Sequence, residues 1–183
     1  ASAYVVFRHL HPDWQEVAFD TRSGELKVTR GAGDLLTMDF PSRPPEPGGV
    51  DSRLKQALGG KPEKVLASRD YMVTYASEDE VRALEPNMFE LGKVDRFVIV
   101  TAPGKDCDFV SRFFAPRAGV PEDPVTGSAH CTLIPYWSER LGKKKLHARQ
   151  VSPRGGELFC EDLGTRVTMA GHAVEYLRGT IYL

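Results

Sequence analysis

Hydrophobic and polar residues alternate along most of this chain, and the alternating segments are short. Alternation with a period of about two predicts β-strands that bury one face. Glycine, proline and aspartate separate the segments and mark turns. The strands expected from these signals are 17–21, 25–30, 35–40, 65–68, 71–75, 97–102, 108–114, 146–151, 157–161, 166–170 and 173–182, of which 97–102 is a continuous apolar run typical of a buried strand. Because strands outnumber helices and seldom alternate with them, the pattern predicts an α+β protein with largely antiparallel pairing.

Four segments have helical character. Residues 1–10 have helical character but no N-cap precedes them, so we expect them to be the later part of a longer helix. A short helix is expected over 50–58, and another begins at the capping box of Ser77 and ends before Pro86. The fourth, 127–141, is apolar on more than one face, which is typical of a core helix surrounded by sheet.

The proline-rich stretch 41–49 is the clearest break in the chain. It holds four prolines and two glycines in nine residues, and such a stretch sustains neither a helix nor a central strand. We therefore expect a domain boundary there, with residues 1–43 before it and 44–172 after it. The final segment, 173–183, is expected to return as a strand toward the first part.

Composition and charge exclude several classes of function. The 183 residues carry 24 Lys and Arg against 25 Asp and Glu, a formal charge of -1, so no basic field favours nucleic acid or anionic lipid. No apolar run approaches the ~20 residues of a membrane span. Three cysteines without CxxC spacing predict neither a disulfide framework nor a zinc site, and scattered histidines give no reason to expect a metal. A reducing cytoplasm is the expected compartment.

The chemistry is concentrated where the loop 115–126 meets the helix 127–141. Thr126 is a suitable N-cap. The backbone amides of Gly127, Ser128 and Ala129 have no acceptor within the helix, and their side chains are small. Together with the helix dipole they predict a site for a carboxylate or phosphate.

Two carboxylates, Glu122 and Asp123, precede this helix start. A carboxylate beside a bound anion is pushed toward its protonated form, which suits proton transfer near neutral pH. Asp123 is the candidate for this role. The plainer alternative is that Asp123-Pro124 is only a turn before an N-cap. His130 is a weaker candidate, since a hydrogen-bonded histidine in a packed helix is the commoner arrangement.

A resemblance to a known family favours an active-site role for Asp123 over a simple turn before the N-cap. The sequence resembles the PhzF-like isomerases of phenazine biosynthesis in the segments 113–116, 122–130 (EDPVTGSAH) and 135–137 (PYW), and also in 20–24, 38–41 and 154–158. The resemblance implies a diaminopimelate-epimerase-like fold, in which each of two halves wraps a mostly antiparallel sheet barrel around a central helix. It also implies a cofactor-independent isomerase or epimerase that moves a proton near the carboxylate of a small metabolite.

By this resemblance Asp123 matches the family's active-site aspartate, and Gly127 and Ser128 match its substrate-binding turn. Thr126 and Ala129 flank that turn. Ser128 stands where a cysteine base is otherwise expected, so we assign it a catalytic role beside Asp123 and disfavour chemistry with two thiols.

The sequence also departs from the family pattern. The family's main catalytic glutamate, in an Asn-Leu-Ser-Glu-Thr-like segment, and a second Gly-His turn do not occur in these residues. By this alignment the chain is a fragment, one complete half plus a remnant of the other over 1–43. The alternative is a non-catalytic binding or protein-interaction module of the same fold. In a naturally short chain, the exposed half-cleft should be apolar and favour a homodimer.

Overall fold

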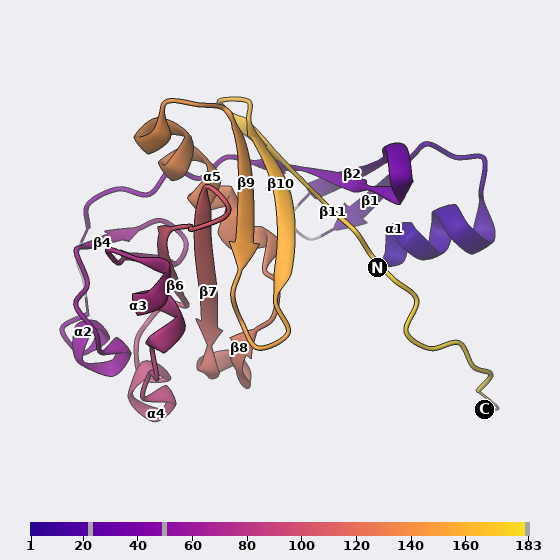
Figure 1. The fold of residues 1–183 in the computed structure, drawn as a ribbon. Coiled ribbons are helices and arrows are strands. Elements are labelled where there is room, and N and C mark those ends of the chain that lie inside the picture. Colours follow the sequence, from indigo (N-terminus) through magenta and orange to yellow (C-terminus); the bar gives the residue numbers. More distant parts are fainter. Residues whose placement is uncertain (22–23, 49–50, 182–183) are drawn as a thin grey trace. The chain divides into compact units, whose positions relative to one another are not determined.

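The computed structural model describes residues 1–21, 24–48 and 51–181 (Figure 1). Strands outnumber helices and form a mixed sheet, so the predicted α+β class is confirmed. The chain divides into two compact units, one of Ala1–Asp39 with Ala170–Leu183 and the other of Phe40–Met169. It passes from the first unit to the second immediately before the proline-rich stretch.

The first unit is a three-stranded meander with a short helical segment. Its elements are α1 (Ser2–Val5), the π-helical turn η1 (Val6–Leu10), β1 (Glu16–Thr21), β2 (Gly24–Arg30), the 3-10 turn η2 (Ala32–Asp34) and β3 (Leu36–Pro41). Both strand pairs are antiparallel, as predicted. Ala3 and Phe7 of the helical segment are buried against Val28 and Leu36 of the meander. Between the strands predicted over 17–21 and 25–30, residues 22 and 23 lie outside the described residues.

The end of the chain differs from the prediction. Residues 172–181 form neither strand nor helix, whereas a strand was expected over 173–182, of which Tyr182 lies outside the described residues. Val174, Tyr176 and Ile181 are 85%, 98% and 86% exposed. A strand needs a neighbour to accept its backbone hydrogen bonds. In the described part of the chain no strand pairs with this segment, whose printed contacts are made by side chains, such as that of Glu175 with His9 at 2.6 Å.

The second unit is built on eight strands. They are β4 (Lys64–Ala67), β5 (Tyr71–Thr74), β6 (Val98–Pro103), β7 (Phe109–Ala115), β8 (Val120–Asp123), β9 (Lys145–Gln150), β10 (Gly156–Asp162) and β11 (Arg166–Gly171). Their order is β11-β10-β9-β7-β6-β5-β4, and β8 also pairs with β7. The pairs β5–β6 and β7–β9 are parallel, whereas β4–β5, β6–β7, β7–β8 and β9–β10 are antiparallel.

The predicted closed barrel is wrong, because the sheet is open. The short edge strand β4 pairs with β5. On its other side, among the described residues, only the isolated bridge between Glu46 and Ala67 meets it. A barrel needs a continuous ladder between its first and last strands, and one bridge to the proline-rich stretch does not supply it.

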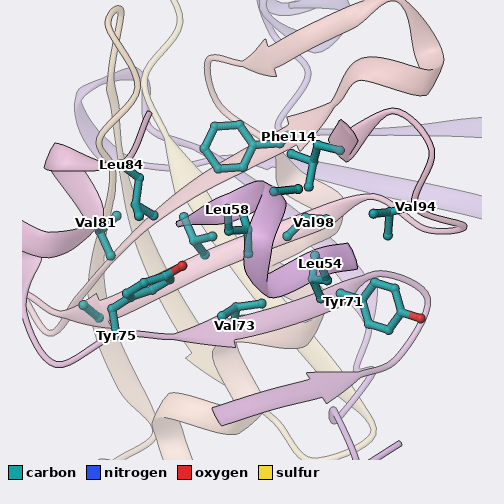
Figure 2. Packing of buried hydrophobic residues seen from close by; sticks show 14 of the residues in the cluster. Leu54, Leu58, Tyr71, Val73, Tyr75, Val81, Leu84, Val94, Val98 and Phe114 are labelled. Atoms are coloured by element: carbon teal, nitrogen blue, oxygen red, sulfur yellow. The ribbon is translucent and has the colours of Figure 1, made fainter. Parts of the chain in front are cut away.

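One face of β5, β6 and β7 is covered by the short helices α2 (Arg53–Leu58), α3 (Glu78–Ala83) and α4 (Met88–Leu91). Figure 2 shows Leu54 and Leu58 of α2 and Val81 of α3 packed over Val73 and Val98. The helix predicted over 50–58 is shorter than expected, and Val50 lies outside the described residues. The sequence pattern did not predict α4.

The other face of the same strands is covered by α5 (Gly127–Leu141), which is the core helix expected from the sequence. Trp137 of α5 is fully buried, and its indole stacks on Phe109 of β7. The indole Nε1 donates a hydrogen bond of 2.9 Å to Thr101 Oγ1 on β6. Since both faces of β6 are covered, its side chains from Val98 to Ala102 are all buried, which explains its continuous apolar run.

Candidate active site

The segment before α5 is positioned by one edge of β7. Phe113 and Phe114 pair with β8, while Phe109–Ser111 pair with β9 on the same edge. The sequence placed Val120–Asp123 in a loop, but these residues form the strand β8. In consequence Asp123, at the end of β8, lies close to Gln150, at the end of β9.

Gln150 joins the two strand ends through its side-chain amide. Its Oε1 accepts a 2.8 Å hydrogen bond from the backbone N–H of Thr126, and its Nε2 donates to the Asp123 carbonyl at 2.6 Å and to Thr126 Oγ1 at 3.2 Å. Gln150 is only 1% exposed. A buried amide with both ends satisfied has one orientation, because any rotation leaves a polar group unpaired.

This arrangement determines what the Thr126 hydroxyl does. Thr126 is the N-cap residue of α5, as predicted, but its side chain does not cap the helix. Because its oxygen accepts from Gln150, its proton is free to be donated elsewhere, and it is donated to the Asp123 carboxylate at short range. The carboxylate of Asp123 is therefore held beside the start of α5.

The first turn of α5 leaves the predicted amides available. Within the part of the chain that the structure describes, none of the backbone N–H groups of Gly127, Ser128 and Ala129 donates to a protein acceptor. All three follow directly on Thr126 and carry the positive end of the helix dipole. Gly127 and Ser128 are partly exposed, whereas Ala129 is buried.

Ser128 also meets a cation. The Nη2 atom of Arg69 donates to Ser128 Oγ at 2.9 Å and lies 3.2 Å from the carboxylate of Asp70. The Arg69 side chain is about half exposed, with 48% of its surface accessible. A guanidinium at the start of α5 adds to the attraction of this turn for an anion.

Glu122 is not available for the same chemistry. Both of its carboxylate oxygens accept from Arg112, at 2.8 and 2.9 Å, in a nearly buried bidentate pair. Arg112 also donates to the carbonyls of Val81 and Leu84 at the end of α3. Glu122 thus stabilises the fold, and the two adjacent carboxylates have separate roles.

His130 lies in the core instead of the site. Its ring is fully buried beside Phe109. Since the carbonyl of Thr126 can only accept, His130 Nδ1 carries the proton of their 2.8 Å hydrogen bond. Nε2 has no partner among the described residues. Burial lowers the pKa of His130 to about 4, opposed in part by the bond to Thr126.

This buried imidazole predicts a loss of stability in acid. Unfolding restores the ordinary pKa of 6.5, so the unfolded state binds more protons and stability falls as the pH drops from 6.5 toward 4. At pH 5 the loss is about 2 kcal/mol relative to pH 7. We expect His130→Asn, measured by urea unfolding at both pH values, to show a smaller acid loss by that amount. The exposed His11→Asn variant is the control, and an unchanged loss in His130→Asn contradicts the prediction.

The thiols are not poised for nucleophilic or metal chemistry. Burial raises the pKa of Cys131, and nearby Arg43, Arg69 and Arg166 offset this only in part. Burial also raises the pKa of Cys107, and that of Cys160 to about 12. In the described ranges, no group of three His, Cys, Asp or Glu side chains is placed to bind a metal ion. No helix there is long and apolar enough to cross a membrane.

Sequence reasoning did not identify Gln150 and Arg69 as parts of the site. Gln150 falls within a predicted strand, 24 residues after its partner Thr126. Arg69 falls between two predicted strands, 59 residues before its partner Ser128. A polar residue at a buried position of an otherwise alternating strand was the one signal for Gln150. Arg69 gave no signal, because only the tertiary structure brings its turn to α5.

Comparisons with known proteins by sequence and by structure point to the same family. The model of the family described as phenazine biosynthesis-like protein (PhzC-PhzF) matches residues 1–179. A protein of Pseudomonas aeruginosa named an uncharacterized isomerase is 50% identical over 185 residues, covering 100% of this chain and 70% of that protein. The crystal structure of a PhzF-family phenazine biosynthesis protein from Enterococcus faecalis is 39% identical, with a TM-score of 0.94, and covers 100% of this chain and 70% of that one. A second crystal structure, a putative PhzC/PhzF protein from Clostridium difficile, is 42% identical, with a TM-score of 0.92, and covers 100% of this chain and 71% of that one.

Proposed function

This chain belongs to the phenazine biosynthesis-like PhzC-PhzF family, and we propose that it is an isomerase- or epimerase-type enzyme that acts on a small carboxylate without a cofactor. The proposal extends to this chain what the name of the P. aeruginosa relative states of that protein. The reaction moves a proton at a carbon next to the substrate's carboxylate.

One observation carries the proposal: at the start of α5, three amides that have no acceptor among the described residues lie next to the carboxylate of Asp123. The amides of Gly127, Ser128 and Ala129 bind the substrate's carboxylate, with Arg69 beside them. Such preorganised donors are worth more in a site that excludes water than in bulk solvent.

The chemistry follows from these positions. When a proton leaves the carbon next to the carboxylate, the electron pair of the broken C–H bond moves onto the carboxylate oxygens. The helix start stabilises that developing charge. Asp123, oriented by Thr126, makes one of the proton transfers, and Ser128 orients the substrate through its hydroxyl. The resemblance assigns the other transfer to a glutamate in a segment that these 183 residues do not contain.

The wider organisation is part of the same proposal. We assign residues 1–43 and 173–183 to one half of a diaminopimelate-epimerase-like fold and 44–172 to the other, in a cytoplasmic protein that forms a homodimer. The chain spans about 70% of the length of the relatives compared, which is consistent with one complete half and part of a second.

Titration with benzoate and succinate tests the binding step. We expect saturable NMR shifts at the amides of Gly127, Ser128 and Ala129. Gly127→Pro removes one donor at a position where proline fits a helix, and Thr126 before it already has the extended backbone that proline requires. We expect it to weaken binding about tenfold or more, since a hydrogen bond to a charged group contributes about 1.5–3 kcal/mol.

Gly127→Ala is the matched control, because it keeps the N–H. An added Cβ meets only Met169 Sδ at 3.5 Å, an ordinary contact. Equal affinities of the Ala and Pro variants, or shifts confined to other parts of the chain, would refute the site.

A further inference from the structure

A groove of about 460 Å³ lies between α3 and the turn of the β9–β10 hairpin. Its lining includes Arg82 of α3, Arg149 of β9, Arg154 of the hairpin turn and Glu157 of β10. A volume of this size is typical of pockets for small metabolites.

The charged side chains of the groove on β9 and β10 lie on the face of the sheet that points away from α5. Ala148 pairs with Phe109, whose ring stacks on Trp137 of α5, so Ala148 faces that helix. Because side chains alternate along a strand, Arg149 and its cross-strand partner Glu157 face the opposite way. The charged side chains of the groove therefore point away from α5, whereas Gln150, which also lines the groove, orients Thr126 at the start of α5.

Positive charge predominates in the groove, and much of it is not neutralised. Arg82 uses its Nε to bind Glu78 at 2.7 Å, which leaves its terminal nitrogens for another acceptor. Arg149 is 3.5 Å from Glu157, a long contact. Glu157 has a closer partner in His147 at 2.7 Å, and the pKa of Glu157 is lowered by that hydrogen bond.

Arg154 has no such partner. It is exposed at the mouth of the groove, and no carboxylate among the described residues forms an ion pair with it. The backbone holds it there, because Gly155 has a positive φ of 71° and donates its N–H to Ser152 Oγ at 3.1 Å. Ser152 in turn donates to the carbonyl of Pro124. These hydrogen bonds within and beside the turn therefore fix the backbone position of Arg154.

We propose that this groove binds a small phosphate-bearing molecule, held by the guanidinium groups of Arg82, Arg149 and Arg154. Planar guanidinium groups bind phosphate oxygens in pairs of parallel hydrogen bonds. These three groups are accompanied by two carboxylates, Glu78 and Glu157, so an excess of positive charge remains that favours an anion. The three guanidinium groups are distinct from the groups of the proposed carboxylate site, and Gln150 lies between the two sites because it lines this groove and also binds Thr126 and Asp123.

The test is an NMR titration of the 183-residue chain with sodium pyrophosphate at constant ionic strength. We expect saturable shifts at the Arg82 Nε–H and at the amides of Gly155 and Gly156. The double variant Arg149→Gln/Arg154→Gln should bind pyrophosphate about 100-fold more weakly, since each lost charge-assisted pair costs about a factor of ten.

The control is Lys61→Gln/Lys64→Gln, which removes the same charge from exposed positions outside the groove. It should bind pyrophosphate within a factor of about two of the parent chain, as expected for screened surface charges. The proposal is overturned if no shift saturates, if both double variants lose affinity equally, or if citrate binds the groove more tightly than pyrophosphate, which would indicate a carboxylate ligand.

Discussion

In a protein that joins this chain to the family's glutamate-containing segment, replacing Asp123 by Asn should abolish proton exchange on the substrate while leaving the fold nearly as stable. A positioned acid or base contributes a factor of about 10²–10⁴ to the rate, and an amide cannot take up the proton. The carboxamide oxygen still accepts from Thr126, so the free energy of unfolding should change by less than about 1 kcal/mol. The measurement is deuterium uptake from D₂O next to the carboxylate of an acid that the protein binds.

The control for this variant is Glu85→Gln, an exposed carboxylate outside the site, which should exchange at the rate of the parent protein. An Asn variant that exchanges as fast as the parent removes Asp123 from the mechanism. If the variant unfolds at a much lower temperature, the hydrogen bond from Thr126 is structural and the catalytic assignment fails.

Replacing Trp137 by Ala should cause the largest loss of stability, about 3–5 kcal/mol. The side chain is fully buried, stacks on Phe109 and donates to Thr101. Its removal opens a cavity between α5 and the sheet and leaves Thr101 Oγ1 without its donor. Urea unfolding followed by circular dichroism measures the effect.

Trp137→Phe separates the two contributions. It keeps an aromatic ring on Phe109 but loses the Nε1 donor, while Thr101 Oγ1 still donates to the Val110 carbonyl, so the loss should be about 1 kcal/mol, that of one hydrogen bond. Equal losses in the Ala and Phe variants would show that the hydrogen bond, and not the packing, anchors α5.

The candidate site shows where sequence reasoning succeeded and where it stopped. Thr126, Gly127, Ser128 and Ala129 were predictable as a helix start, because capping and free amides are properties of neighbours in the chain. Asp123 was predictable because it is three residues from Thr126. The restraint on Asp123 by Gln150 was not predictable, since β8 was not recognised as a strand and the pairing of β7 with both β8 and β9 is non-local.

The same distinction applies to the adjacent carboxylates. Local sequence placed Glu122 and Asp123 side by side before the helix start, and Asp123 was the residue predicted to handle the proton. Only the pairing with Arg112, ten residues earlier and across β7–β8, removes Glu122 from the site. His130 likewise looked like a neighbour of Ser128, but the helix turns its ring into the core against Phe109.

By itself the sequence determined the α+β class, most strand positions, the core helix over 127–141 and the motif residues around Asp123, because periodicity, capping and turn chemistry act between near neighbours. The tertiary structure decided that the sheet stays open, that residues 173–181 form no strand, and that three arginines meet in one groove. Each of these depends on which distant segments face each other, and a pattern of local hydrophobicity does not encode that choice.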